Sequence, residues 1–167
     1  MHANLDYEIS KSYKYYGSRL IQFVKHNFIL YIPDFILLTI LAVPPYQMQE
    51  TLMIITALVL LGFRDIVVMR RSINYLKEFK VNDSAVEYSV LRYNQVYENR
   101  KTHISKIVLQ LQEDSKPYTL DIYDEGVLVH RQYAIGYWSM DYLKELYTKF
   151  SNLKKDMNLE IMFKGTF

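Results

Sequence analysis

Two mostly apolar segments separated by a short polar turn dominate the hydrophobic pattern of this chain. They cover residues 28–46 and 52–69, and the turn reads PPYQMQE over residues 44–50. A membrane-spanning helix needs about 20 predominantly apolar residues, and both segments approach that length. Pro44 and Pro45 fit a helix end, because proline disfavours a helical conformation in the residue before it. The pattern therefore predicts a helical hairpin over residues 27–71.

The distribution of charge around this hairpin predicts how it is oriented. The turn contains no Lys or Arg, whereas residues 1–26 carry four basic side chains and residues 64–80 carry five. Basic residues concentrate on the cytoplasmic side of membrane segments. We therefore expect a transmembrane hairpin in the cell (inner) membrane with both termini cytoplasmic. The alternative is a soluble protein with two apolar core helices, because the charge-free residues 51–63 are also short enough for a buried core helix.

Two charged residues fall inside the predicted hairpin. At about 1.5 Å per residue, Asp34 lies about 15 Å from the turn and Arg64 about 21 Å from it. Ionisable groups inside a membrane are candidates for function and usually have a partner. A possible intramembrane ion pair between Asp34 and Arg64 follows. In the alternative, Arg64 and Asp65 reach the headgroups and Asp34 pairs with a basic neighbour.

The segment before the hairpin, residues 1–26, is expected to be an N-terminal amphipathic helix that begins near Tyr7. Its apolar residues recur at helical spacing, with basic and polar residues on the other side. Such a helix fits the plane of the membrane interface, or its apolar side packs on the C-terminal domain. Possible lipid-headgroup contacts on both sides of the hairpin are Lys11, Lys14, Lys25, Arg70 and Arg71.

After the hairpin the apolar period changes from helical to alternating. From residue 79 to about 137 the pattern predicts about six short antiparallel strands. The expected turns are at Asn82-Asp83, at residues 113–117 and at residues 124–126, with a polar break at residues 98–101. One face of these strands is apolar and needs cover.

A C-terminal amphipathic helix supplies that cover. Ser139 is its expected N-cap, with Asp141 in the first turn. The apolar stripe is Tyr142, Leu143, Leu146, Phe150 and Leu153, and the residues expected to face away are Lys144, Glu145, Lys149 and Lys154. The chain thus divides into the N-terminal helix (1–26), the hairpin (27–71), the sheet domain with its closing helix (72–156) and a tail (157–167).

Composition narrows the chemistry. The chain has no cysteine, which excludes disulfides, thiol catalysis and cysteine-based zinc sites. None of its four histidines has a partner at metal-ligand spacing, and its five glycines are scattered. Residues 81–167 carry eleven basic and twelve acidic side chains, unlike the basic face of a nucleic-acid-binding domain. We therefore expect no catalytic residue, metal site, cofactor or nucleic-acid partner.

The order of these elements resembles a known group of proteins. A strand meander closed by one helix resembles the pleckstrin-homology-like (PH-like) domains of bacteria. With the hairpin and the stretch RQYAIGYWSMDYLKELYTKF at residues 131–150, the chain resembles small bacterial membrane proteins similar to YcxB. Such proteins often carry a Trp-Ser pair before an isoleucine in mid-domain, whereas residues 102–107 here read THISKI. The resemblance implies an α+β membrane protein with a PH-like antiparallel sheet domain, and no established activity or site residue.

Two functional hypotheses follow. The first is a non-enzymatic, membrane-anchored PH-like protein whose domain serves as an interaction module for protein or lipid at the cytoplasmic face. The second is an immunity protein or transporter-accessory protein that works through its transmembrane hairpin. The expected partners are the lipid bilayer and a protein of unknown identity.

Overall fold

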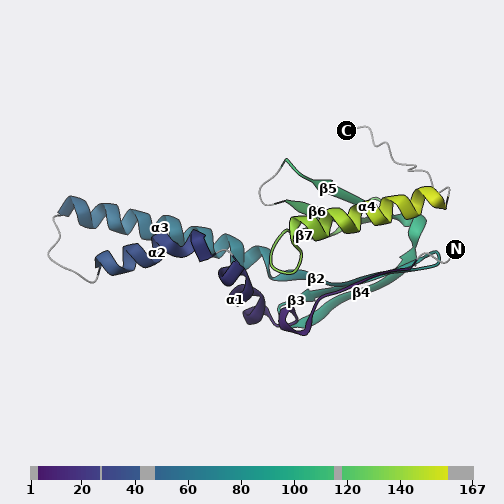
Figure 1. Cartoon of the computed structure of the whole chain (residues 1–167), viewed down its shortest axis with the longest axis horizontal. Coiled ribbons are helices and arrows are strands. Elements are labelled where there is room, and N and C mark those ends of the chain that lie inside the picture. Colours follow the sequence, from purple (N-terminus) through teal and green to yellow (C-terminus); the bar gives the residue numbers. More distant parts are fainter. Residues whose placement is uncertain (1–3, 27, 42–47, 115–117, 158–167) are drawn as a thin grey trace.

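The computed structural model describes residues 4–26, 28–41, 48–114 and 118–157. This part of the chain is α+β, with two antiparallel sheets and a C-terminal helix. In chain order the elements are β1 (Leu5–Glu8), η1 (Lys11–Tyr13), α1 (Tyr16–His26), α2 (Phe28–Leu41), α3 (Met48–Arg71), β2 (Asn74–Asn82), β3 (Ala85–Arg92), β4 (Gln95–His103), η2 (Ile104–Lys106), β5 (Ile107–Gln112), β6 (Thr119–Asp124), β7 (Val127–Tyr133) and α4 (Met140–Asp156). Figure 1 shows α2 and α3 projecting side by side from a body formed by the sheets and α4.

The strands follow the alternating pattern of the sequence. One sheet has the order β1-β2-β3-β4 and the other β5-β6-β7. The prediction of about six antiparallel strands after the hairpin is confirmed in number by β2 to β7, although the first of them begins at Asn74 and the last ends at Tyr133. Asp83, Glu125 and Gly126 have φ values of 52°, 52° and 81°, as two-residue hairpin turns require. The predicted polar break at residues 98–101 is wrong. These residues continue β4, whose polar side chains are tolerated because β4 is an exposed edge strand.

The N-terminal segment differs from the predicted helix. Residues 5–8 form β1, in which Tyr7 pairs with Phe79 of β2, and α-helix begins only at Tyr16. The reason is a short alternation within the helical spacing: Tyr7 and Ile9 are buried, whereas the residues on either side of Tyr7 are exposed. Because β1 pairs with β2, the helices α1, α2 and α3 form an insertion between two neighbouring strands of one sheet.

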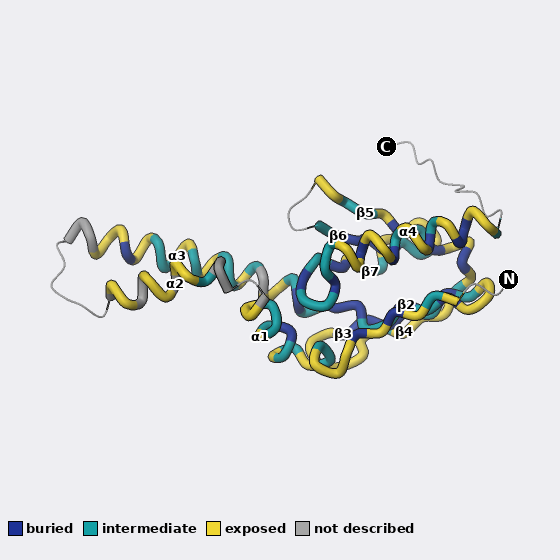
Figure 2. The backbone as a smooth tube through the Cα atoms, in the orientation of Figure 1, coloured by how far each residue is buried: buried dark blue, intermediate teal, exposed yellow. Residues whose placement is uncertain are grey.

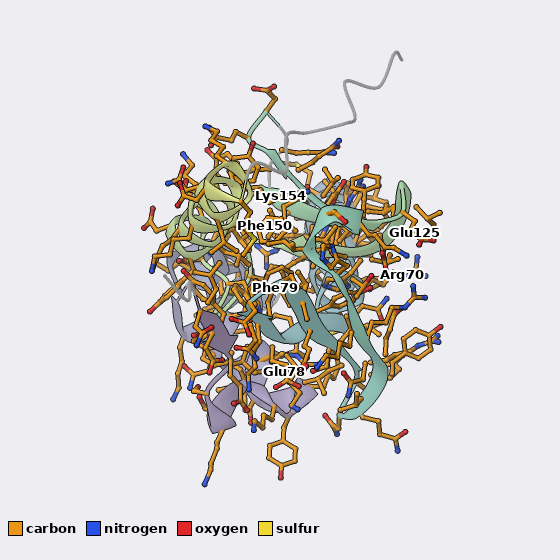
Figure 3. The ribbon with its side chains drawn as sticks, turned by 90° about the vertical axis from the view of Figure 1, so that its right-hand side faces the viewer. Arg70, Glu78, Phe79, Glu125, Phe150 and Lys154 are labelled. Carbon is orange, nitrogen blue, oxygen red and sulfur yellow. The ribbon has the colours of Figure 1, made fainter. Side chains whose placement is uncertain are left out.

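The hydrophobic core lies between the two sheets and beneath α4. Phe79 of β2 and Phe150 of α4 meet edge to face with ring centroids 5.6 Å apart, and Figure 3 shows the two side chains in the middle of the domain. Trp138 is fully buried, and its Nε1 donates a hydrogen bond of 2.7 Å to the Leu76 carbonyl. This bond fixes the entry of α4 to the centre of the first sheet.

The predicted closing helix is confirmed, with two changes to its faces. The Ser139 side chain accepts a hydrogen bond from the Tyr142 backbone amide, as expected of an N-cap. Tyr142 itself is 43% exposed, because its ring stacks on Tyr137 instead of entering the core. Lys154, expected to face away, is buried and donates from Nζ to the Ile107 carbonyl at 2.7 Å. The four remaining stripe residues are buried: Leu143, Leu146, Phe150 and Leu153.

Figure 2 shows most described residues of α2 and α3 as exposed or intermediate, and many of the exposed ones are large and apolar. The hydroxyls of Thr39 and Thr56 donate to backbone carbonyls one turn earlier, so neither requires water. The exposed large apolar residues on the two helices are Ile32, Phe35, Ile36, Ile40, Leu52, Met53, Ile55, Val59, Leu60, Phe63, Ile66 and Met69.

Length distinguishes the two helices. At about 1.5 Å per residue, α3 is about 36 Å long and the described part of α2 about 21 Å, against a hydrocarbon thickness of about 30 Å. Among the described residues, one helix, Thr51–Arg71, is long and apolar enough to cross a membrane, and 6% of its most apolar window is buried. Residues 44–47 of the predicted turn lie outside the described residues, and residues 48–50 belong to α3. The two-helix transmembrane hairpin therefore stays a prediction.

Candidate functional site

Of the two residues in the predicted ion pair within the hairpin, the structure describes the side chain of Arg64 only. Asp34 belongs to α2, and its side chain lies outside the described part of the structure, so the pair with Arg64 stays a prediction. The Arg64 guanidinium donates to Asp65 Oδ1 at 3.1 Å from Nε and 3.0 Å from NH2. It also lies 4.6 Å from the ring centroid of Tyr31 on α2. Arg64 thus has a cation–π contact that joins the two helices.

The five predicted headgroup residues separate into two groups. Lys11 and Lys25 are exposed. Lys14 donates from Nζ to Glu8 Oε1 at 3.0 Å, and this hydrogen bond lowers the pKa of Glu8. Arg70 and Arg71, the last two residues of α3, lie apart from these lysines in a hollow against β7.

We refer to this hollow, of about 320 Å³, as the arginine hollow. The Arg71 guanidinium lies 5.3 Å from the ring centroid of Tyr133, which holds Arg71 against the end of β7. Figure 3 shows Arg70 on the side of the domain away from α4. Three arginines and no carboxylate occur among the described residues that line the hollow, which are Arg70, Arg71, Asn74, Val129, His130, Arg131 and Tyr133.

A buried carboxylate holds the third arginine of the hollow in place. Asp121 of β6 is fully buried. Arg131 binds it in a bidentate manner, with 2.7 Å from Nε to Oδ1 and 2.6 Å from NH2 to Oδ2. Gln112 of β5 donates to the same carboxylate at 3.1 Å. The hydrogen bonds to Asp121 raise the pKa of Arg131 above its usual value. Arg131 is therefore a fixed cation at the rim of the hollow.

His130 forms part of the wall of the hollow without adding charge at neutral pH. Its side chain is buried, and burial lowers its pKa to about 4. One ring nitrogen, Nε2, lies 3.3 Å from Gln132 Oε1, and the same oxygen accepts a hydrogen bond from the Leu76 amide at 2.8 Å. Gln132 therefore links the neutral imidazole to β2 of the other sheet.

Arg19 of α1 joins the insertion to the sheet domain. Its side chain is buried. Its NH1 donates to the carbonyls of Tyr13 and Lys14 at 3.1 and 3.2 Å, and its NH2 donates to those of Ser72 and Tyr93 at 3.3 and 2.7 Å. The guanidinium carbon lies 4.9 Å from the ring centroid of Tyr75. Arg19 therefore joins the segment before α1, the residue after α3 and the β3–β4 turn.

Sequence reasoning counted Arg19 only as one basic residue of the cytoplasmic flank. The sequence does contain a sign that Arg19 is buried. It falls three residues after Tyr16 and four before Phe23, on the apolar side of α1. A cation at such a position packs inside the protein instead of facing the headgroups. Burial accordingly lowers the pKa of Arg19.

Chemically, the arginine hollow is an arrangement of hydrogen-bond donors. Guanidinium groups, the Asn74 amide and the Tyr133 hydroxyl can all donate to an anion. No group of three or more His, Asp or Glu residues that could hold a metal ion occurs among the residues described. No family model, curated protein or solved structure matches this chain.

Proposed function

We propose that this protein is a non-enzymatic, membrane-anchored PH-like protein that holds an interaction module for protein or lipid at the cytoplasmic face of the cell (inner) membrane. One observation carries the proposal. Among the described residues, the helical pair exposes twelve large apolar side chains, and only 6% of the most apolar window of α3 is buried. An exposed apolar surface of that extent is typical of a membrane or protein contact. A core helix of a soluble protein would be mostly buried.

The arrangement of the sheets supports the PH-like part of the proposal. Seven antiparallel strands form two sheets, and a C-terminal helix covers the core between them, within the described residues. This agrees with the resemblance of the sequence to bacterial membrane proteins similar to YcxB. In this proposal the membrane hairpin is an insertion between β1 and β2, so the domain is attached to the membrane through a paired sheet edge.

The charge distribution supports the cytoplasmic location. Both chain segments that enter and leave the hairpin are basic, and α3 ends with Arg70 and Arg71. Basic residues beside a membrane segment remain in the cytoplasm during insertion and are attracted to anionic lipid headgroups. The turn at the far end carries no basic residue.

Alkaline carbonate extraction of membranes tests the anchoring. We expect the full chain to remain in the membrane pellet at high pH, where peripheral proteins are released. The reason is that the exposed surface of α3 is apolar, so its attachment to the membrane does not depend on charge. Release of the chain into the soluble fraction would contradict membrane insertion. A resident integral membrane protein of the same cells serves as the control.

Exchanging the hairpin distinguishes the second hypothesis, an immunity or transporter-accessory role, from the interaction-module proposal. Residues 28–69 are replaced by an unrelated hairpin of equal length, and crosslinked neighbours are compared with those of the native chain. We expect the neighbours of the sheet domain to be unchanged. If the neighbours are lost with the native hairpin, the hairpin itself is the working part.

A further inference from the structure

We propose that the arginine hollow is a binding site for a phosphate group, and that its ligand in the cell is the phosphate of an anionic phospholipid in the cytoplasmic leaflet. The lipid source rests on the membrane location proposed above. The phosphate chemistry rests on the hollow itself. Free inorganic phosphate shares that chemistry, so the two sources need separate measurements.

The charge of the hollow favours an anion. Arg70 and Arg71 form no ion pair with any carboxylate of the described residues. Arg131 is offset by Asp121, so three guanidiniums against one carboxylate leave two net positive charges. His130 stays neutral near pH 7, because burial lowers its pKa to about 4. An anion with one to two negative charges would balance the site.

The donors of the hollow are held in place before any ligand arrives. Arg131 is fixed by two hydrogen bonds to a fully buried carboxylate, and Arg71 packs against the Tyr133 ring. Both therefore lose little side-chain freedom on binding. Guanidinium groups bind phosphate oxygens in a bidentate manner that an ammonium group cannot reproduce. The volume of about 320 Å³ is at the small end of ligand pockets, which fits a headgroup phosphate and not a whole lipid.

The depth of the hollow relative to the hairpin agrees with a headgroup ligand. If the outer end of α3 near Glu50 marks one boundary of the hydrocarbon region, a thickness of about 30 Å corresponds to about 20 residues of helix. That count reaches Arg70. The hollow at the end of α3 would then open into the headgroup layer, where a lipid phosphate lies within reach of Arg70 and Arg71.

The experiment measures binding to the purified full chain in a neutral detergent. The probes are dioleoyl phosphatidylglycerol, dioleoyl phosphatidylcholine and inorganic phosphate, and the readouts are lipid retention in native mass spectrometry and isothermal titration. The test variant is Arg70→Gln with Arg71→Gln. The matched control is Lys101→Gln with Lys144→Gln, which removes the same charge from β4 and α4. A third variant, Arg70→Lys with Arg71→Lys, keeps the charge but not the fork of donors.

We expect phosphatidylglycerol to bind more tightly than phosphatidylcholine, whose choline cation opposes the arginines. The glutamine pair should weaken binding of phosphatidylglycerol by about 30-fold, since each basic residue near an anionic lipid contributes about fivefold. The lysine pair should lie between this variant and the native chain, and the control should stay within about twofold of it. Unchanged unfolding midpoints in each variant show that the fold is intact.

Equal binding by the glutamine pair and the control would overturn the phosphate site. Binding of inorganic phosphate alone, lost in the glutamine pair, would keep the phosphate site and overturn its lipid source. The outcome is independent of membrane anchoring, because the measurement is made in detergent. If the chain resists carbonate extraction but its lipid binding does not depend on the arginines, the phosphate site is contradicted and the membrane anchoring is not.

Discussion

At the scale of single residues, Arg19 joins the helical insertion to the sheet domain. Four backbone carbonyls from three separate segments accept its hydrogen bonds, and the described residues provide no carboxylate at this site. Removing the guanidinium would leave the buried Ser72 carbonyl and three part-buried carbonyls without this donor, and a buried group left unsatisfied costs about 1–3 kcal/mol. The geometry requires a planar fork of donors, so lysine cannot replace arginine here.

We expect Arg19→Lys to lower the free energy of unfolding by roughly 2–4 kcal/mol, because one ammonium group cannot reach all four carbonyls. Lys11→Gln, at an exposed position of η1, should change it by less than about 0.5 kcal/mol. Chemical unfolding of the full chain in neutral detergent provides the measurement. Equal, small losses for both variants would show that the hydrogen bonds of Arg19 contribute little.

His130 predicts a pH dependence of stability. Burial lowers its pKa from 6.5 to about 4, so the unfolded chain takes up the proton first as the pH falls. The stability that the neutral, buried His130 contributes is fully present above pH 6.5 and is lost as the pH falls from 6.5 to 4. From pH 7 to pH 5 the loss is about 2 kcal/mol.

The measurement is the free energy of unfolding at pH 7 and pH 5 for the native chain and for His130→Asn. Asparagine keeps a polar side chain and removes the titration, so its pH dependence should be smaller by about 2 kcal/mol. Among the described residues, four carboxyl groups have lowered pKa values: Glu8, Glu78, Glu125 and Glu145. Their contributions to stability are lost at lower pH in both proteins. Parallel pH profiles would exclude His130 as the cause.

Among the elements, α4 is the one on which the closed core depends. Leu146 is fully buried, whereas Lys149 is on the outer face and pairs with Glu145 at 2.6 Å. We expect Leu146→Ala to cost about 2–5 kcal/mol and Lys149→Ala less than about 0.5 kcal/mol. The full chain is needed for this unfolding measurement, because a fragment from residue 72 onward lacks β1 and exposes an edge of β2. Similar losses for the two variants would mean that α4 does not cover the core.

Sequence periodicity predicted the elements whose buried faces repeat regularly within the element itself. The middle of β4 was predicted as a polar break, because this strand shows no alternation. Alternation identified β2, β3, β5, β6 and β7, and the spacing of Leu143, Leu146 and Phe150 identified the buried face of α4. It missed β1, because four residues give a weak alternation and the partner strand comes about 70 residues later. It also placed Lys154 in solvent, since its acceptor is the Ile107 carbonyl of another element.

The candidate site was predictable only in part for the same reason. Arg70 and Arg71 could be proposed as headgroup contacts, because their position beside an apolar segment is visible in the sequence. Their grouping with Arg131 could not, because it depends on how the end of α3 packs against β7. The ion pair between the buried Asp121 and the exposed Arg131 is likewise formed across two strands.

In the whole molecule, the insertion of the helical pair between β1 and β2 sets how the domain sits relative to the hairpin. The insertion is bounded by two strands that pair with each other, and Arg19 binds the residue just after α3. Both ends are thus fixed to the first sheet. If the helical pair is inserted in a membrane as proposed, the domain is therefore held at a defined position relative to it and does not hang from a flexible linker.

Membrane topology is the central claim, and cysteine labelling in intact cells tests it most directly. The chain has no native cysteine, so single substitutions Gln47→Cys in the predicted turn and Asn152→Cys on α4 each give one reactive thiol. Asn152 is exposed, so its thiol is accessible once cells are opened. With a membrane-impermeant maleimide, we expect labelling at position 47 in intact cells, and labelling at position 152 only after lysis. Labelling at position 152 in intact cells, or protection at position 47 until lysis, would contradict a hairpin with both termini in the cytoplasm.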